Sequence, residues 1–109
     1  MQIGIDIGSV SIGAIFITDD KIVVSHYFPH KGDISGALKK VVESIDEPEA
    51  KICFTGKDMI VNPEILYLDP IVAVTDGVCS NYPNVSHILS IGGESYTLIH
   101  LKNKRLQNY

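Results

Sequence analysis

Two short turns, each rich in glycine and hydroxyl groups, carry the residues whose types can do chemistry. The first reads Asp6-Ile7-Gly8-Ser9-Val10-Ser11, and the second reads Ser90-Ile91-Gly92-Gly93-Glu94-Ser95. Gly8 permits close approach of the backbone to a ligand, and Ser9 and Ser11 add hydroxyl and N–H donors. Because donors that converge at a strand turn can hold phosphate oxygens, the first turn is a candidate phosphate site.

Each turn also carries one carboxylate that can take part in such chemistry. Asp6 can hold a hydrated Mg²⁺, because this ion keeps several waters and takes only one or two carboxylates. Asp6 interrupts an apolar strand, where an unpaired carboxylate would be costly, and this favours a ligand there. Gly92 and Gly93 let two consecutive N–H groups approach an anion, and Glu94 can orient a water or accept its proton. Either turn can also be a plain hairpin with a polar tip.

The strands that must hold the first turn are predicted from alternating hydrophobicity. Ile3, Ile5 and Ile7 are separated by single small or polar residues, which is the period of a strand. The same period, with turn residues between the segments, predicts strands over residues 3–7, 11–18 and 21–28. Three strands with two short connections form an antiparallel meander.

Helices and further strands follow this meander. Apolar residues at helical spacing over 34–45, after Asp33 or Ser35 as a cap, predict the first helix. A β-branched strand over 50–55 then implies a right-handed crossover and parallel pairing with the meander. The remaining pattern predicts a short helix over 70–79 and a hairpin over 86–101, whereas residues 57–68 follow neither period.

The composition restricts the classes of function. The chain has 109 residues, of which 45% are hydrophobic, and this suffices for one core. A net charge of -4 with scattered Lys and Arg argues against a nucleic-acid partner. No apolar run reaches the roughly 18–20 residues of a membrane span, and no basic region precedes the first strand. We therefore expect a cytoplasmic protein without a membrane partner.

Taken together, the two turns resemble those of the ASKHA superfamily (acetate and sugar kinases, Hsp70 and actin). Its members bind ATP between two lobes, with one phosphate hairpin from each lobe. More narrowly, the chain resembles the BadF/BadG/BcrA/BcrD ATPase family, which includes the activators of 2-hydroxyacyl-CoA dehydratases and of benzoyl-CoA reductases. Four stretches carry this resemblance: residues 3–9, His26-Tyr27-Phe28-Pro29-His30, Pro63-Glu64-Ile65 and Ile91-Gly92-Gly93-Glu94.

The resemblance implies an α/β fold of the RNase H-like (actin/hexokinase-type) kind. Its parts would be the three-stranded meander, a parallel strand, two helices and a C-terminal hairpin. Residues 1–85 would form the first lobe, and residues 86–109 the hairpin that begins the second lobe. The chain would then be about the first third to half of a family domain. The hairpin over 86–101 is expected either to fold back on the same sheet or to pair with another copy, which gives a homodimer.

The resemblance also implies a cofactor, ATP or ADP with Mg²⁺, and a role for each residue of the turns. Asp6 would hold the hydrated metal ion, and Glu94 would act at the attacking water. The phosphate oxygens would be bound by Gly8, Ser9 and Ser11 from the first turn and by Gly92 and Gly93 from the second. In a full-length relative, ATP hydrolysis would activate a partner, the dehydratase or reductase component for a CoA ester.

This sequence departs from the family pattern at positions that carry charge. The family lysine of the first motif is replaced by Gly13, and the charged residues around the second are replaced by Ser90, Ser95 and Thr97. Each lost charge-assisted contact is worth roughly 1.5–3 kcal/mol, so we expect weak nucleotide binding and poorer catalysis. We also expect no turnover by this chain alone, because the resemblance does not extend to the adenosine-binding second lobe. Cys53 and Cys79 do not match the family's cluster cysteines, so no iron–sulfur cluster is expected in this chain.

Two other functions remain open at this point. The missing lysine favours a non-catalytic interaction or scaffold domain, which keeps the fold and has a degenerate phosphate site. The third possibility is one lobe of a small-molecule kinase, because N-acetylglucosamine kinases share the family. That kinase would need a sugar-binding carboxylate, which the sequence does not identify.

Overall fold

The computed structural model describes residues 1–45, 49–57, 66–92, 95–102 and 105–108. The chain divides into two units, Met1–Leu68 and Asp69–Tyr109, which are described one at a time. The stretch Pro63-Glu64-Ile65, together with Gly93 and Glu94, lies outside the described residues. Neither of the two described helices is long and apolar enough to cross a lipid bilayer.

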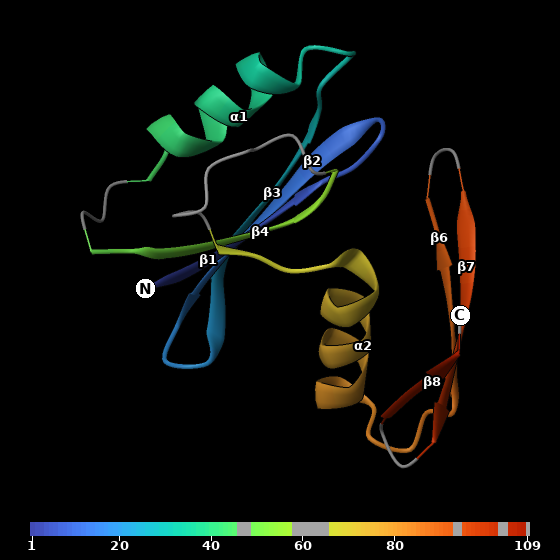
Figure 1. Ribbon diagram of the computed structural model, residues 1–109. Helices are drawn as coiled ribbons and strands as arrows, with labels where there is room; N and C mark the ends of the chain where they lie inside the picture. Colours follow the sequence, from blue (N-terminus) through green and yellow to red (C-terminus); the bar gives the residue numbers. More distant parts are fainter. Residues whose placement is uncertain (46–48, 58–65, 93–94, 103–104, 109) are drawn as a thin grey trace. The chain divides into compact units, whose positions relative to one another are not determined.

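The first unit is built on a five-stranded sheet with the strand order β3-β2-β1-β4-β5 (Figure 1). β1 pairs antiparallel with β2, β2 pairs antiparallel with β3, and β4 lies parallel to β1. The predicted meander and the parallel crossover strand are therefore confirmed. The five strands are β1 Gln2–Ile7, β2 Ser11–Thr18, β3 Lys21–Pro29, β4 Lys51–Gly56 and β5 Leu66–Tyr67.

Strand β1 lies in the middle of this sheet and has two different faces. Ile3, Ile5 and Ile7 are each at most 2% exposed, whereas the residues between them point to the exposed face. Asp6 belongs to that exposed face, so the prediction that an unpaired carboxylate would be costly at this point of the apolar strand was wrong. The reason is the strand period of two, which places Asp6 opposite to its isoleucine neighbours. Burial therefore gives no argument for a ligand at Asp6.

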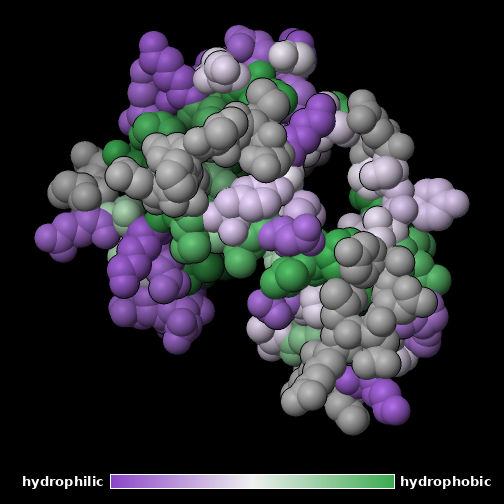
Figure 2. Space-filling view, in the orientation of Figure 1, coloured by the Kyte–Doolittle hydropathy of each residue, from purple (hydrophilic) through white to green (hydrophobic). Residues whose placement is uncertain are grey.

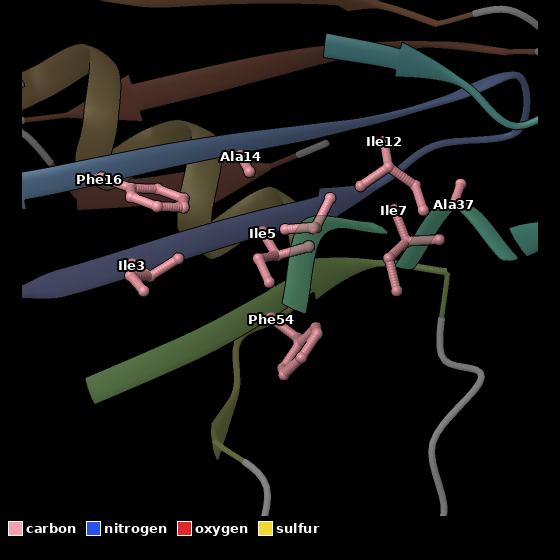
Figure 3. Close-up of a cluster of buried hydrophobic side chains, with 9 residues drawn as sticks. Ile3, Ile5, Ile7, Ile12, Ala14, Phe16, Ala37 and Phe54 are labelled. Carbon is pink, nitrogen blue, oxygen red and sulfur yellow. The ribbon is translucent and has the colours of Figure 1, made fainter. Parts of the chain in front are cut away.

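Helix α1 (Ile34–Glu43) covers the isoleucine face of the sheet (Figure 3). Asp33 is its cap, because the Asp33 carboxylate accepts a hydrogen bond from the Gly36 N–H at 3.0 Å. From the helix, Ala37 and Val41 pack against the strand residues, and Val41 is fully buried. The core of the unit therefore lies on one side of the sheet, and the opposite face of β1 is left open.

The second unit packs helix α2 against a separate sheet with the order β6-β7-β8. Ile88, Ile99 and Leu101 form its buried core against the apolar side of the helix. The predicted hairpin is present, but it joins β8 and not the five-stranded sheet, so of the two expected alternatives the one in which it folds back on that sheet was wrong. The elements are α2 Pro70–Asn81, β6 His87–Ile91, β7 Tyr96–Lys102 and β8 Arg105–Asn108.

The outer face of this hairpin is apolar and exposed. Leu89 pairs with Leu98 and Ile91 pairs with Tyr96 across β6 and β7, and their exposed fractions range from 47% to 78%. Apolar side chains at the surface are coloured green in Figure 2. Contiguous exposed apolar side chains commonly mark an interaction surface.

Candidate functional site

The turn between β1 and β2 is closed by one backbone hydrogen bond. The Gly8 N–H donates to the Ser11 carbonyl at 2.8 Å. A Cβ on Gly8 would lie 3.0 Å from that same oxygen, so the close approach favours glycine. In the described part of the chain, the N–H groups of Ser9, Val10 and Ser11 have no acceptor at this turn. The predicted phosphate turn therefore offers free donors.

His30, the residue that directly follows β3, contacts this turn through its side chain and its backbone. Its side chain is only 6% exposed, and its Nε2 lies 3.0 Å from the Gly8 carbonyl. The Gly32 N–H donates to its Nδ1 at 3.0 Å, so Nδ1 is the acceptor and Nε2 carries the proton. The backbone N–H of His30 donates to the Val10 carbonyl, also at 3.0 Å. His30 thus contacts the turn at both of its sides.

The sequence did not identify His30 as a site residue. Its partner Gly8 is 22 residues away, and no metal-ligand or nucleophile spacing includes it. The sequence did contain one indication that His30 is functional, because His30 is the last residue of the His26-to-His30 stretch that carries the family resemblance. The structure shows that His30 is buried directly after a strand whose residues are mostly exposed.

Asp6 lies on the open face of the sheet, one residue before the end of β1. Its neighbours across the two adjacent strands are Gly13 on β2 and Thr55 on β4. A Cβ on Gly13 would meet no atom within 4 Å, so that side of the carboxylate is open. A single accessible carboxylate with free space beside it fits a hydrated Mg²⁺, which needs few protein ligands. Among the described residues, no three His, Cys, Asp or Glu side chains gather into a metal cluster.

The end of β4 fixes the end of β1 through a second glycine. Gly56 has a φ of +94°, which side-chain-bearing residues rarely adopt, and its position allows the Lys57 N–H to donate to Ile7 at 2.7 Å. A Cβ on Gly56 would lie 2.1 Å from the Ile7 carbonyl oxygen and 2.7 Å from Oδ1 of Asp6. Only glycine fits there without displacing the carboxylate.

The turn of the second unit closes in the same way as the first. The Gly92 N–H donates to the Ser95 carbonyl at 2.8 Å, which is the same spacing of three residues as in the Gly8 turn. Gly92 is exposed. The two phosphate-turn candidates therefore share a closing hydrogen bond, each within its own unit.

The histidines are not spaced along the chain as in common metal-binding motifs, but the sheet register brings one pair together. His87 and His100 face each other across β6 and β7, with ring centroids 4.5 Å apart. Ser86 Oγ lies 2.9 Å from Nδ1 of His87. No third ligand joins this pair among the described residues.

Two solved structures of dehydratase activators are similar to this chain. An activator of the 2-hydroxyisocaproyl-CoA dehydratase from Clostridium difficile, with bound ADPNP, matches with a TM-score of 0.80 and 22% identity. Component A of the (R)-2-hydroxyglutaryl-CoA dehydratase from Acidaminococcus fermentans matches with a TM-score of 0.78 and 23% identity. The chain has the fold of these dehydratase activators.

Both matches extend over nearly the whole chain but only part of the other protein. They cover 98% of this chain, and 43% and 45% of the respective activators. The chain therefore spans less than half the length of the activators it resembles. No protein-family model matches the sequence, and no curated protein sequence does. The expected activase resemblance is confirmed at the level of the activator fold.

Gly56 and Gly13, the two glycines beside Asp6, differ in the loss of stability that we predict when each is replaced by alanine. Gly56→Ala introduces a Cβ at a positive φ and against Ile7, so it should lower the free energy of unfolding by about 1–3 kcal/mol. Gly13→Ala fills open space in a strand, so the change should stay below about 1 kcal/mol. Urea denaturation measures both values. Equal losses in the two variants would contradict the assigned backbone constraint.

Proposed function

We propose that this chain is the nucleotide-binding part of an activase-type ATPase. The observation that carries the proposal is the β1–β2 turn, where the N–H groups of Ser9 and Ser11 have no acceptor in the described part of the chain, and where β1 carries the exposed residue Asp6 just before the turn. Backbone donors bind phosphate oxygens, and the carboxylate suits the hydrated cation that accompanies a nucleotide. The activator fold supports the same function, since the Clostridium difficile activator was solved with ADPNP.

In this proposal each turn has a distinct role. Asp6 would hold a hydrated Mg²⁺, and the ion would neutralise the phosphate charge. The first turn binds one set of phosphate oxygens through Gly8, Ser9 and Ser11. By the resemblance, Gly92 and Gly93 of the second turn would bind further phosphate oxygens, and Glu94 would lie at the attacking water. Residues 1–85 would form a first lobe, and residues 86–109 would begin a second lobe.

The glycine at position 13, where the family has a lysine, limits what the chain does alone. Gly13 leaves the space beside Asp6 without a cation, so phosphate binding depends on backbone dipoles and on Mg²⁺. Charge stabilisation in the transition state is usually the largest catalytic term. We therefore propose that this chain binds nucleotide weakly and does not turn it over. In a longer relative, hydrolysis would be coupled to activation of a CoA-ester dehydratase or reductase.

A scaffold domain with a degenerate phosphate site is the second candidate function. The same missing cation at Gly13 favours it, because it removes a contact on which phosphate affinity depends. The two candidates differ in one measurable property, the affinity for Mg·ADP.

Isothermal titration with Mg·ADP separates these two functions. A nucleotide-binding site predicts a dissociation constant in the millimolar range or tighter, and Asp6→Ala should abolish the signal because the ion loses its only proposed protein ligand. Glu43→Ala removes an exposed carboxylate from α1 of the same unit and should change nothing. Absence of heat with the unaltered chain would instead support the scaffold.

Adding a lysine at the position where the family has one gives a gain-of-function test. A side chain at position 13 enters open space opposite Asp6, so Gly13→Lys should tighten Mg·ADP binding about tenfold or more through a charge-assisted contact. Ile15→Lys adds the same charge on the same strand face, beside Gly4, and serves as the matched control. Equal tightening by both variants would show a nonspecific charge effect.

We also propose that the exposed outer face of the β6–β7 hairpin pairs with a second copy. Leu89 and Leu98 form an apolar cross-strand pair there. Burial of such side chains stabilises an interface by roughly 25 cal/mol per Å² of apolar surface. Light scattering of the purified chain should therefore give a dimer mass, and Leu98→Asp should shift it toward the monomer. Ile22→Asp, on the exposed edge strand β3, is the control; a monomeric unaltered chain contradicts the proposal.

A further inference from the structure

We propose that His30 is a positioning residue that opens the β1–β2 turn for phosphate. This inference rests on the proposed nucleotide function and adds the residue that shapes its site. In an ordinary two-residue hairpin, the residues that flank the turn exchange two hydrogen bonds. Here the Gly8 N–H donates to the Ser11 carbonyl, but the return bond from the Ser11 N–H is absent. The Gly8 carbonyl instead faces the His30 ring at 3.0 Å.

Because the peptide bond is planar, the contact between His30 and the Gly8 carbonyl also fixes the direction of the N–H group that follows. In a trans peptide, the carbonyl oxygen and the following N–H point in opposite directions. The bond from His30 to the Gly8 carbonyl therefore directs the Ser9 N–H away from the imidazole. The bond from the His30 backbone to the Val10 carbonyl directs the Ser11 N–H away in the same manner. One buried residue thus orients the two serine amides that the proposed phosphate site uses.

The loop after β3 holds the ring in the required orientation. Lys31 and Gly32 have φ values of +51° and +84°, and this bend brings the Gly32 N–H onto Nδ1 of His30. The Asp33 N–H donates back to the His30 carbonyl at 2.8 Å. Because Nδ1 accepts, the neutral ring carries its proton on Nε2 and can donate to Gly8. The ring is positioned by bonds that are local in sequence, and it acts on a turn that is distant in sequence.

Two amide substitutions separate the ring's two contacts. The side-chain amide of His30→Gln can reach the position of Nε2 and donate to Gly8, whereas the shorter side chain of His30→Asn reaches only the position of Nδ1. The inference predicts that Gln keeps the open turn and that Asn and Ala lose it. When the contact is lost, the Gly8 carbonyl becomes available to the Ser11 N–H, and the hairpin closes with its second bond.

Hydrogen exchange of the nucleotide-free chain, followed by NMR, tests this directly. Ser11 amide exchange should slow about tenfold in His30→Asn and His30→Ala, since a new hydrogen bond protects it, and should stay unchanged in His30→Gln. A purely structural histidine would instead make exchange faster throughout the turn. Unchanged Ser11 exchange in both the Asn and Ala variants, or a Gln variant that behaves like Asn, would overturn the inference.

Two further measurements keep this test independent of the variants' stability and of the proposed function. Nitrogen-15 shifts of the unaltered imidazole should report the Nε2–H tautomer, and the opposite tautomer would overturn the inference even if the variants do not fold. Mg·ADP affinity should fall about tenfold in His30→Asn and stay within about threefold in His30→Gln. If the unaltered chain binds no Mg·ADP, the nucleotide function fails, while the exchange result still decides the role of His30.

Discussion

The hydrogen bond between the His30 ring and the Gly8 carbonyl is the interaction on which the candidate site depends. The Gly8 carbonyl accepts from the His30 ring and not from the Ser11 N–H. The Ser11 N–H, which would close an ordinary hairpin at this point, therefore stays available to a ligand. A buried imidazole with both nitrogens bonded has little freedom to move, so the turn it holds is preformed. Preformed donors need no reorganisation when an anion arrives.

The surrounding glycines are there for different physical reasons. Gly8 and Gly56 lie where a Cβ would press on backbone oxygen, so they bring chain segments close together. Gly13 has free space around it and contributes openness beside Asp6. The resulting site is tightly constrained in its backbone and has no side chain at position 13. Such a site can bind phosphate by dipoles and a metal ion while lacking the cation that would stabilise a developing charge.

Much of the first unit could be predicted from the sequence because its signals are local. The alternation of Ile3, Ile5 and Ile7 predicted β1, and helical spacing after Asp33 predicted α1. The boundaries differ slightly, since α1 ends at Glu43 and not at residue 45. The same alternation places Asp6 on the face opposite the isoleucines, so this residue is exposed although the strand around it is apolar. Period decides the face, whereas composition alone does not.

The missed features all depend on contacts between distant residues. Strand β5 has two residues and exists through its pairing with β4, and β8 exists through its pairing with β7. No local period predicts strands this short. His30 reaches Gly8 only because the β2–β3 register brings the end of β3 back to the first turn. The cross-strand pair of His87 and His100 was invisible to spacing rules for the same reason.

An NMR titration of the isotope-labelled chain with Mg·ADP tests the central claim most directly. If the β1–β2 turn binds phosphate through its free donors, the backbone amides of Ser9 and Ser11 should show the largest saturable shifts in the first unit. Inorganic phosphate with Mg²⁺ should move the same amides at higher concentration. Saturable shifts that leave Ser9 and Ser11 unmoved, or no saturable shifts at all, would contradict the claim.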